Sequence, residues 1–107
     1  MQFIRPKRIP EANIQAELYK RLKDLNIESM LEYRFKDFHL RADLVVIKNN
    51  EIICACEVKS RITQRPIHLG KQFQKYLKIG VPIFYCLNQQ DVDKTIERIS
   101  VLYNKID

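Results

Sequence analysis

Glycine and proline are scarce in this sequence, which has two glycines and four prolines among 107 residues. Collagen-like and low-complexity chains need far more of both residues, and a hydrophobic content of 46% excludes a disordered chain. No apolar run approaches the roughly 18–20 residues that cross a bilayer, and no apolar stretch follows the basic N-terminal residues as in a signal peptide. We therefore expect a single domain over residues 1–107 with no membrane partner.

Cysteine is also scarce, and the three cysteines cannot all pair within one chain; they are Cys54, Cys56 and Cys86. This favours a reducing, cytoplasmic compartment. Three cysteines are one fewer than an iron–sulfur cluster takes, so no such cluster is expected. His39 and His68 have no second histidine or cysteine at metal-ligand spacing, which argues against a zinc site.

Positive charge is concentrated in one segment. The net charge is +6, and residues 59–78 carry six basic side chains and no acidic one, which equals the whole net charge. Segregated charge of one sign predicts a surface that binds a polyanion such as a nucleic acid. The alternative is a solvated helix face, because lysine-rich helices are common.

The first half of the chain has the pattern of one helix followed by three strands. Apolar residues recur at helical spacing behind Pro10, which predicts an amphipathic helix over 11–25. Three extended runs follow, at 29–35, 40–47 and 51–59. Asn49-Asn50 between the last two is a tight-turn signal, because asparagine tolerates positive φ, so we expect an antiparallel meander.

The second half has the pattern helix, strand, helix. Pro66 opens a helix that runs to Ile79, where Gly80 is placed to end it. An apolar strand over 81–87 has the pattern of a strand covered on both faces. The last helix, 91–105, has an apolar stripe of Val92, Ile96, Ile99, Tyr103 and Ile106. The whole order predicts an α/β fold with a mixed sheet between helices.

Charged residues interrupt the apolar pattern of the central strands at Asp43, Glu57 and Lys59. Acids are depleted in strands and are seldom buried without a partner. Strand alternation puts Ile53, Ala55, Glu57 and Lys59 on one face, with the cysteines of that strand on the other. If the two strands pair through the asparagine turn, Asp43 approaches Glu57; the sequence alone does not determine the register.

Two converging carboxylates repel, and burial raises the cost of ionising both, so such a pair takes up a shared proton or a cation. Carboxylates with water and phosphate are the ligands that Mg²⁺ prefers, and this ion would polarise a phosphodiester and lower the pKa of a bound water. Lys59 would then position or activate that water, or stabilise the developing charge. The alternative is that the two acids form salt bridges with Arg41 and Lys59 at the strand ends.

These residues resemble the motif of the PD-(D/E)XK nuclease superfamily, which includes restriction-type endonucleases, archaeal Holliday-junction resolvases and RecB-like nucleases. The resemblance lies in Ala42-Asp43, thirteen intervening residues, and Glu57-Val58-Lys59, and it covers nearly the whole chain. It implies a restriction-endonuclease-like α-β-β-β-α-β-α core. It also implies that Asp43, Glu57 and the Val58 carbonyl bind Mg²⁺, or Mn²⁺ in its place, and that Lys59 is catalytic. Ala42 departs from the family pattern, which has proline there.

The resemblance extends to two helical features. The family often has an acid on the first helix that joins the metal site, for which Glu17 is the match and Glu11 the second candidate. RecB-like members carry a glutamine and a tyrosine four residues apart on the helix after the third strand. Gln72 and Tyr76 match this pattern, with Gln74 as a competing choice.

The resemblance and the basic segment together lead us to expect a metal-dependent DNA endonuclease. Its substrate stays open among a junction, a flap, a single strand and a defined site, and a homodimer is expected because cutting two strands needs two active sites. The residues expected to hold DNA, mainly through phosphates, are Arg61, Arg65, His68, Lys71, Lys75 and Tyr76. The alternatives are a nucleic-acid-binding module without catalysis and an accessory subunit whose basic face meets an acidic protein.

Overall fold

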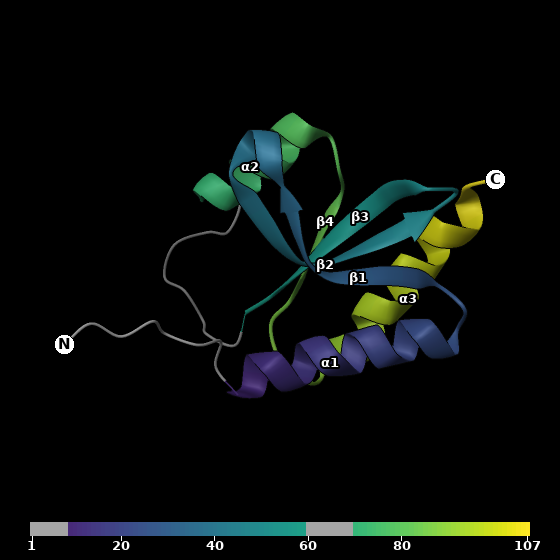
Figure 1. Ribbon diagram of the computed structural model, residues 1–107. Helices are drawn as coiled ribbons and strands as arrows, with labels where there is room; N and C mark the ends of the chain where they lie inside the picture. The colour runs from purple at the N-terminus through teal and green to yellow at the C-terminus, as the bar shows by residue number, and fades with distance from the viewer. Residues whose placement is uncertain (1–8, 60–69) are drawn as a thin grey trace.

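The computed structural model describes residues 9–59 and 70–107 (Figure 1). The elements, in chain order, are α1 (Ile9–Asp24), β1 (Glu28–Phe35), the 3₁₀ turn η1 (Lys36–Phe38), β2 (Leu40–Lys48), β3 (Glu51–Val58), α2 (Lys71–Ile79), β4 (Ile83–Cys86) and α3 (Asp91–Lys105). This is the expected mixed α/β fold. No helix within these ranges has the length and apolar character needed to cross a bilayer.

The four strands form one sheet in the order β1-β2-β3-β4. β2 is antiparallel to both β1 and β3, which confirms the predicted meander, and β4 is parallel to β3. Asn49 and Asn50 join β2 to β3 with φ of 55° and 66°, in the left-handed region that asparagine tolerates. β4 lies at the edge of the sheet and is shorter than the predicted run 81–87.

The sheet lies between two helical layers, as expected (Figure 1). α1 and α3 cover one face, where Leu18, Cys56 and Ile99 belong to the larger buried cluster. α2 covers the other face, over a smaller cluster that contains Val45 and Tyr76. All three cysteines are free and buried, and they lie in the larger cluster.

The start of α2 differs from the prediction. Gly70 has an extended backbone, with φ −74° and ψ 154°, so the helix begins at Lys71 and does not run on from Pro66, which lies outside the described residues. Glycine costs about 0.5–1 kcal/mol in a helix interior and is tolerated at the residue before a helix, which explains the boundary. Gly80 ends the helix as predicted, in the left-handed conformation at φ 80°.

A β-bulge in β3 corrects the predicted alternation. Val46 pairs with Cys54, but the next residue of β2 pairs with Ile52, so Ile53 is an extra residue. Ile53 therefore packs against the α1–α3 layer and Ile52 against the α2 layer, the reverse of the prediction. Beyond the bulge the predicted faces hold, since Ala55 lies in the α2 cluster and Cys54 in the α1–α3 cluster.

Candidate active site

The bulge also determines which residues lie opposite each other at the end of the β2–β3 pairing, beyond Leu44 and Cys56. The two-residue turn alone would place Asp43 opposite Cys56. With Ile53 as an extra residue, Leu44 lies opposite Cys56, and Asp43 comes level with Glu57. The bulge therefore brings the aspartate of one strand beside the glutamate of the next.

Hydrogen bonds between side chains and backbone join the two strands at this level. The Val58 N–H donates to Asp43 Oδ2 at 2.8 Å, and the Asp43 N–H donates to Glu57 Oε2 at 3.1 Å. Each carboxylate thus accepts a hydrogen bond from the backbone of the opposite strand. Both side chains are withdrawn from water, because Asp43 is 9% exposed and Glu57 is 2% exposed.

A break in the alternation of β2 accompanies this arrangement. Ala42 and Val45, on either side of Asp43, both belong to the α2 cluster, whereas Leu44 belongs to the α1–α3 cluster. Glu32, the residue of β1 at this level, has a φ of 53°, and the β1–β2 pairing skips Glu32 and Asp43. Positive φ is uncommon for a residue other than glycine, so the chain is locally strained beside the two acids.

α2 supplies two further hydrogen bonds to Glu57. Tyr76 Oη donates to Glu57 Oε2 at 2.7 Å, and Gln72 Nε2 donates to Glu57 Oε1 at 2.8 Å. These residues lie one turn apart on the helix, so they reach the same carboxylate. Of the two glutamines that the sequence left as alternatives, Gln72 contacts Glu57, whereas Gln74 is exposed.

The environment of Glu57 raises its pKa from 4.5 to about 7. Burial is the largest cause, because it disfavours the charged form, and the nearby charge of Asp43 acts in the same direction. The hydrogen bonds from Tyr76 and from the Asp43 backbone, and the positive charge of Lys59, lower this pKa. The Glu57 carboxylate is therefore partly protonated at neutral pH, and a cation that binds there would displace the proton.

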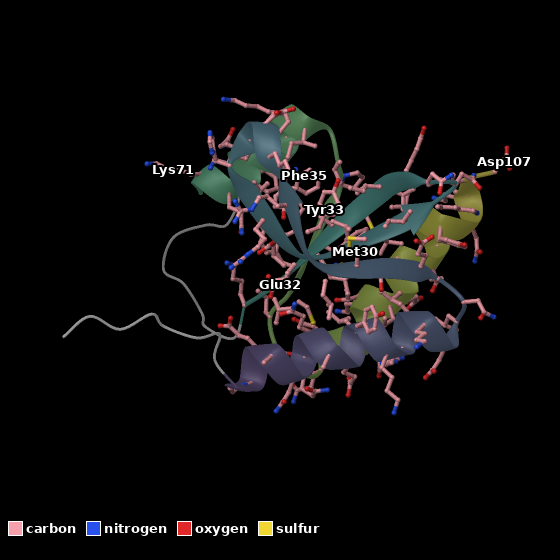
Figure 2. All side chains as sticks on the ribbon, viewed as in Figure 1. Met30, Glu32, Tyr33, Phe35, Lys71 and Asp107 are labelled. Carbon is pink, nitrogen blue, oxygen red and sulfur yellow. The ribbon has the colours of Figure 1, made fainter. Side chains whose placement is uncertain are left out.

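α1 reaches the site through Gln15, a residue that sequence reasoning missed. Gln15 is buried, and its Nε2 donates to the Asp43 carbonyl oxygen at 2.9 Å and to Glu32 Oε1 at 3.1 Å. Figure 2 shows Glu32 on the side of β1 that faces α1, opposite Tyr33 and Phe35. A glutamine next to the apolar positions Ile14 and Leu18 of α1 was the one available signal in the sequence.

The two acids proposed for α1 lie differently with respect to Gln15. The Glu17 carboxylate accepts a hydrogen bond from Gln89 Nε2 at 2.7 Å, on the chain between β4 and α3. Glu11 lies four residues before Gln15 and so shares its helix face. The face of α1 that contacts Asp43 is therefore the face of Glu11.

Lys59 directly follows β3. Its N–H donates to the Cys86 carbonyl at 2.9 Å, which keeps the chain in register with β4 beyond the last residue of the strand. The side chain is half-buried, and its positive charge acts on Glu57. The ammonium group is thus held on the chain two residues after one of the paired acids.

Tyr85 is a second residue that the sequence did not indicate for the site. It lies directly opposite Glu57 in the parallel β3–β4 ladder. Its hydroxyl is buried and has no hydrogen-bond partner among the residues the structure describes. Burial and the charge of Glu57 raise the pKa of Tyr85 to about 12, so the hydroxyl remains a proton donor at neutral pH.

The residues expected to hold DNA are placed unequally. Arg61, Arg65 and His68 lie outside the described residues. Lys71 is exposed at the start of α2, and Lys75 Nζ donates to the His39 carbonyl at 3.1 Å (Figure 2). Tyr76 is only 1% exposed and donates to Glu57, so it supports the acid pair and does not present a surface for DNA.

The donor set of the acid pair fits a hard divalent cation. Mg²⁺ is usually bound through one or two carboxylates, with water and phosphate oxygens completing its shell. Asp43 and Glu57 supply two carboxylates, and residues 9–59 and 70–107 contain no group of three or more His, Cys, Asp or Glu suited to a metal. After burial, the charge of Asp43 is the main cause of the raised pKa of Glu57, and a cation between them would relieve that repulsion.

Comparison with protein-family models, curated proteins and solved structures found no match for this chain. The likeness of Asp43, Glu57 and Lys59 to a nuclease motif therefore remains a resemblance.

Removing the Tyr76 hydroxyl should weaken the support of Glu57. In Tyr76→Phe we expect a loss of about 1.5–3 kcal/mol in the free energy of unfolding at pH 8, because a buried hydrogen bond to a charged group is lost. The pKa of Glu57 should rise further, since that hydrogen bond lowers it. Urea denaturation measures the loss, and Tyr19→Phe, which removes the same group from an exposed side chain, is the control. Equal stability of the two variants would contradict this role.

Proposed function

We propose that this protein is a metal-dependent endonuclease that hydrolyses phosphodiester bonds in DNA, with a restriction-endonuclease-like core of the PD-(D/E)XK type. The observation that carries the proposal is the pair of hydrogen bonds at the end of the β2–β3 pairing: the Asp43 N–H donates to the Glu57 carboxylate, and the Val58 N–H donates to the Asp43 carboxylate. Lys59 follows on the same strand end, at the spacing of the superfamily's motif. The order of helices and strands in the described residues is compatible with that core.

Each residue of the cluster has a distinct role in the proposed reaction. Asp43 and Glu57 hold the cation, which would be Mg²⁺ or Mn²⁺; when bound, it polarises the phosphodiester and lowers the pKa of a water. Lys59 orients the attacking water or stabilises the negative charge that develops on the phosphate. Gln72 and Tyr76 fix the carboxylate of Glu57 in place, as outer partners of metal ligands do.

A Glu57 pKa of about 7 suits the proposed role as a cation ligand. A carboxylate that is partly protonated in the free protein becomes fully ionised when a cation binds, so cation binding releases a proton. Lys59 and the Tyr76 hydroxyl already favour the ionised form, and the cation adds to them. The hydrogen bonds from the Asp43 N–H and the Tyr76 hydroxyl keep the Glu57 carboxylate oriented both with and without the cation.

DNA is the proposed partner because the chain carries a net charge of +6 that equals the charge of the segment 59–78. Lys71 and Lys78 are exposed cations of that segment in α2. Phosphate contacts of this kind give affinity without sequence information. We also propose a two-fold homodimer, because cutting both strands of a duplex needs two copies of the acid pair; light scattering in solution tests this.

Incubation with end-labelled duplex, single-stranded and four-way-junction DNA, in Mg²⁺ or in EDTA, tests the proposed activity. We expect at least one substrate to be cut in Mg²⁺ and none in EDTA. Binding of DNA without cleavage in Mg²⁺ or Mn²⁺ would contradict the proposal and favour a binding module without catalysis. Absence of DNA binding, with binding to an acidic protein instead, would favour an accessory subunit.

A further inference from the structure

The β1–β2 hairpin carries two arginines in an electrostatically unfavourable position. Arg34 and Arg41 are direct partners in the antiparallel ladder. Side chains directly opposite each other in such a ladder have Cβ atoms about 4.5–5.5 Å apart, and like charges there are destabilising. Both residues are exposed, with 62% of the Arg41 side chain accessible, so packing does not require either of them.

The arginines lie on the opposite side of the hairpin from α2. Tyr33, Phe35 and Leu40, their neighbours along the two strands, pack in the α2 cluster. Strand alternation therefore directs Arg34 and Arg41 to the other face, the face on which Glu32 contacts α1. The pair is thus separate from the cations of α2.

Compensation of the two positive charges is incomplete. Glu32 Oε2 lies 3.4 Å from Arg41 Nε, while the other Glu32 oxygen accepts from Gln15. Arg34 has no ion-pair partner within residues 9–59 and 70–107. Two arginines paired across the ladder, with one half-exposed carboxylate beside them, leave a net positive charge at the surface, and an anion with several oxygens would balance it.

The same contacts tie this positive surface to the acid pair. Arg41 lies two residues before Asp43 on β2, roughly 7 Å along the strand. That span is comparable to the distance between neighbouring phosphates of one nucleic-acid strand. Gln15 bonds both Glu32 and the Asp43 carbonyl, so the residue that orients Arg41 is fixed to the backbone of the acid pair.

We propose that Arg34 and Arg41 form a phosphate-binding pair for DNA. The phosphate that they hold belongs either to the neighbouring DNA strand or, on the strand being cut, to the position next to the scissile phosphate. The inference rests on the proposed function for the identity of the polyanion, and it adds a second contact surface across the hairpin from α2. A bound phosphate offsets the repulsion between the two guanidinium groups. The positive φ of Glu32 places its carboxylate beside Arg41, which it orients. This single carboxylate does not neutralise both arginines.

Fluorescence anisotropy with a short labelled duplex in EDTA, over a range of salt concentrations, tests the pair. The variants are Arg34→Gln and Arg41→Gln, and Arg98→Gln is the matched control, since it removes an exposed cation from α3. For each hairpin variant we expect affinity to fall about fivefold at 0.15 M salt and the log–log salt slope to fall by about 0.9. The control should bind within twofold of wild type with its slope unchanged.

The stability of the Arg34→Gln variant provides a second readout. If Arg34 served only to stabilise the fold, its replacement would lower the urea midpoint. Arg34→Gln removes a like-charge neighbour, so its urea midpoint should equal or exceed that of wild type while its DNA affinity falls. Unchanged salt slopes in both hairpin variants would overturn the proposal, even if the wild type cuts DNA. Absence of DNA binding by the wild type, or binding to polyglutamate in its place, would overturn it as well. DNA binding without cleavage, with reduced salt slopes in the hairpin variants, supports phosphate binding by the pair and contradicts only the nuclease activity.

Discussion

Replacing Asp43 by asparagine is expected to abolish DNA cleavage while leaving DNA binding nearly intact. Asparagine keeps an oxygen that can accept the Val58 N–H, so the junction of β2 and β3 should persist. The variant loses the charge that holds a divalent cation, and its cleavage rate should fall by more than the 10–100-fold typical for removing an outer partner of a metal ligand. Single-turnover cleavage in Mg²⁺ measures the rate, and anisotropy measures the binding.

Two companion variants make this result specific to the acid pair. Glu51→Gln removes an exposed carboxylate from the other end of β3 and should cut at the wild-type rate. Lys59→Met keeps the length of the side chain but removes its charge, so cleavage should fall while cation binding remains. If Asp43→Asn cuts DNA as fast as wild type, the assignment of the cation to this pair is wrong.

Replacing Glu57 by glutamine should stabilise the fold at alkaline pH while it abolishes cleavage. The pKa of Glu57 is raised from 4.5 to about 7, chiefly by burial and then by the charge of Asp43. A shift of this size corresponds to roughly 3 kcal/mol in the free energy of unfolding. The glutamine amide at position 57 is neutral at every pH. An amide has both a donor and an acceptor, so the two amides can turn to form a hydrogen bond between position 57 and Gln72, and the variant avoids most of this cost.

The sign of the effect follows from proton binding. Between pH 4.5 and about 7 the folded protein holds a proton on Glu57 that the unfolded chain has released, so wild-type stability falls as pH rises through this range. Urea denaturation should therefore show little difference between Glu57→Gln and wild type near pH 5, and a difference that approaches roughly 3 kcal/mol at pH 8. Glu51→Gln should follow the wild type at both values. A variant that is less stable than wild type at pH 8 would show that Glu57 is ionised without cost.

Short-range patterns were sufficient to predict the architecture of the chain. The asparagine turn specified that β2 and β3 pair, the apolar period of 91–105 gave the last helix, and Gly80 gave the end of α2. The proximity of Asp43 and Glu57 also followed from the expected pairing, although its register did not. These features depend on neighbours in sequence, and for that reason one sequence is enough to predict them.

The features that build the site depend on tertiary contacts, which no local pattern encodes. Regular pairing from the two-residue turn would have set Asp43 opposite Cys56, and only the bulge at Ile53 brings it level with Glu57. The reach of Gln15 to the Asp43 carbonyl spans 28 residues. The raised pKa of Glu57 likewise arises from burial that only the assembled layers produce.

The binding of a divalent cation to the acid pair is tested most directly by titrating the protein with Mn²⁺ in an isothermal calorimeter. The wild type, Asp43→Asn, Glu57→Gln and Glu51→Gln are compared at pH 7.5, and their thermal midpoints are recorded with and without the ion. We expect saturable binding, proton release and a raised midpoint in the wild type and in Glu51→Gln, and none of these in the two site variants. Equal Mn²⁺ binding by all four proteins would contradict the claim that Asp43 and Glu57 hold the cation.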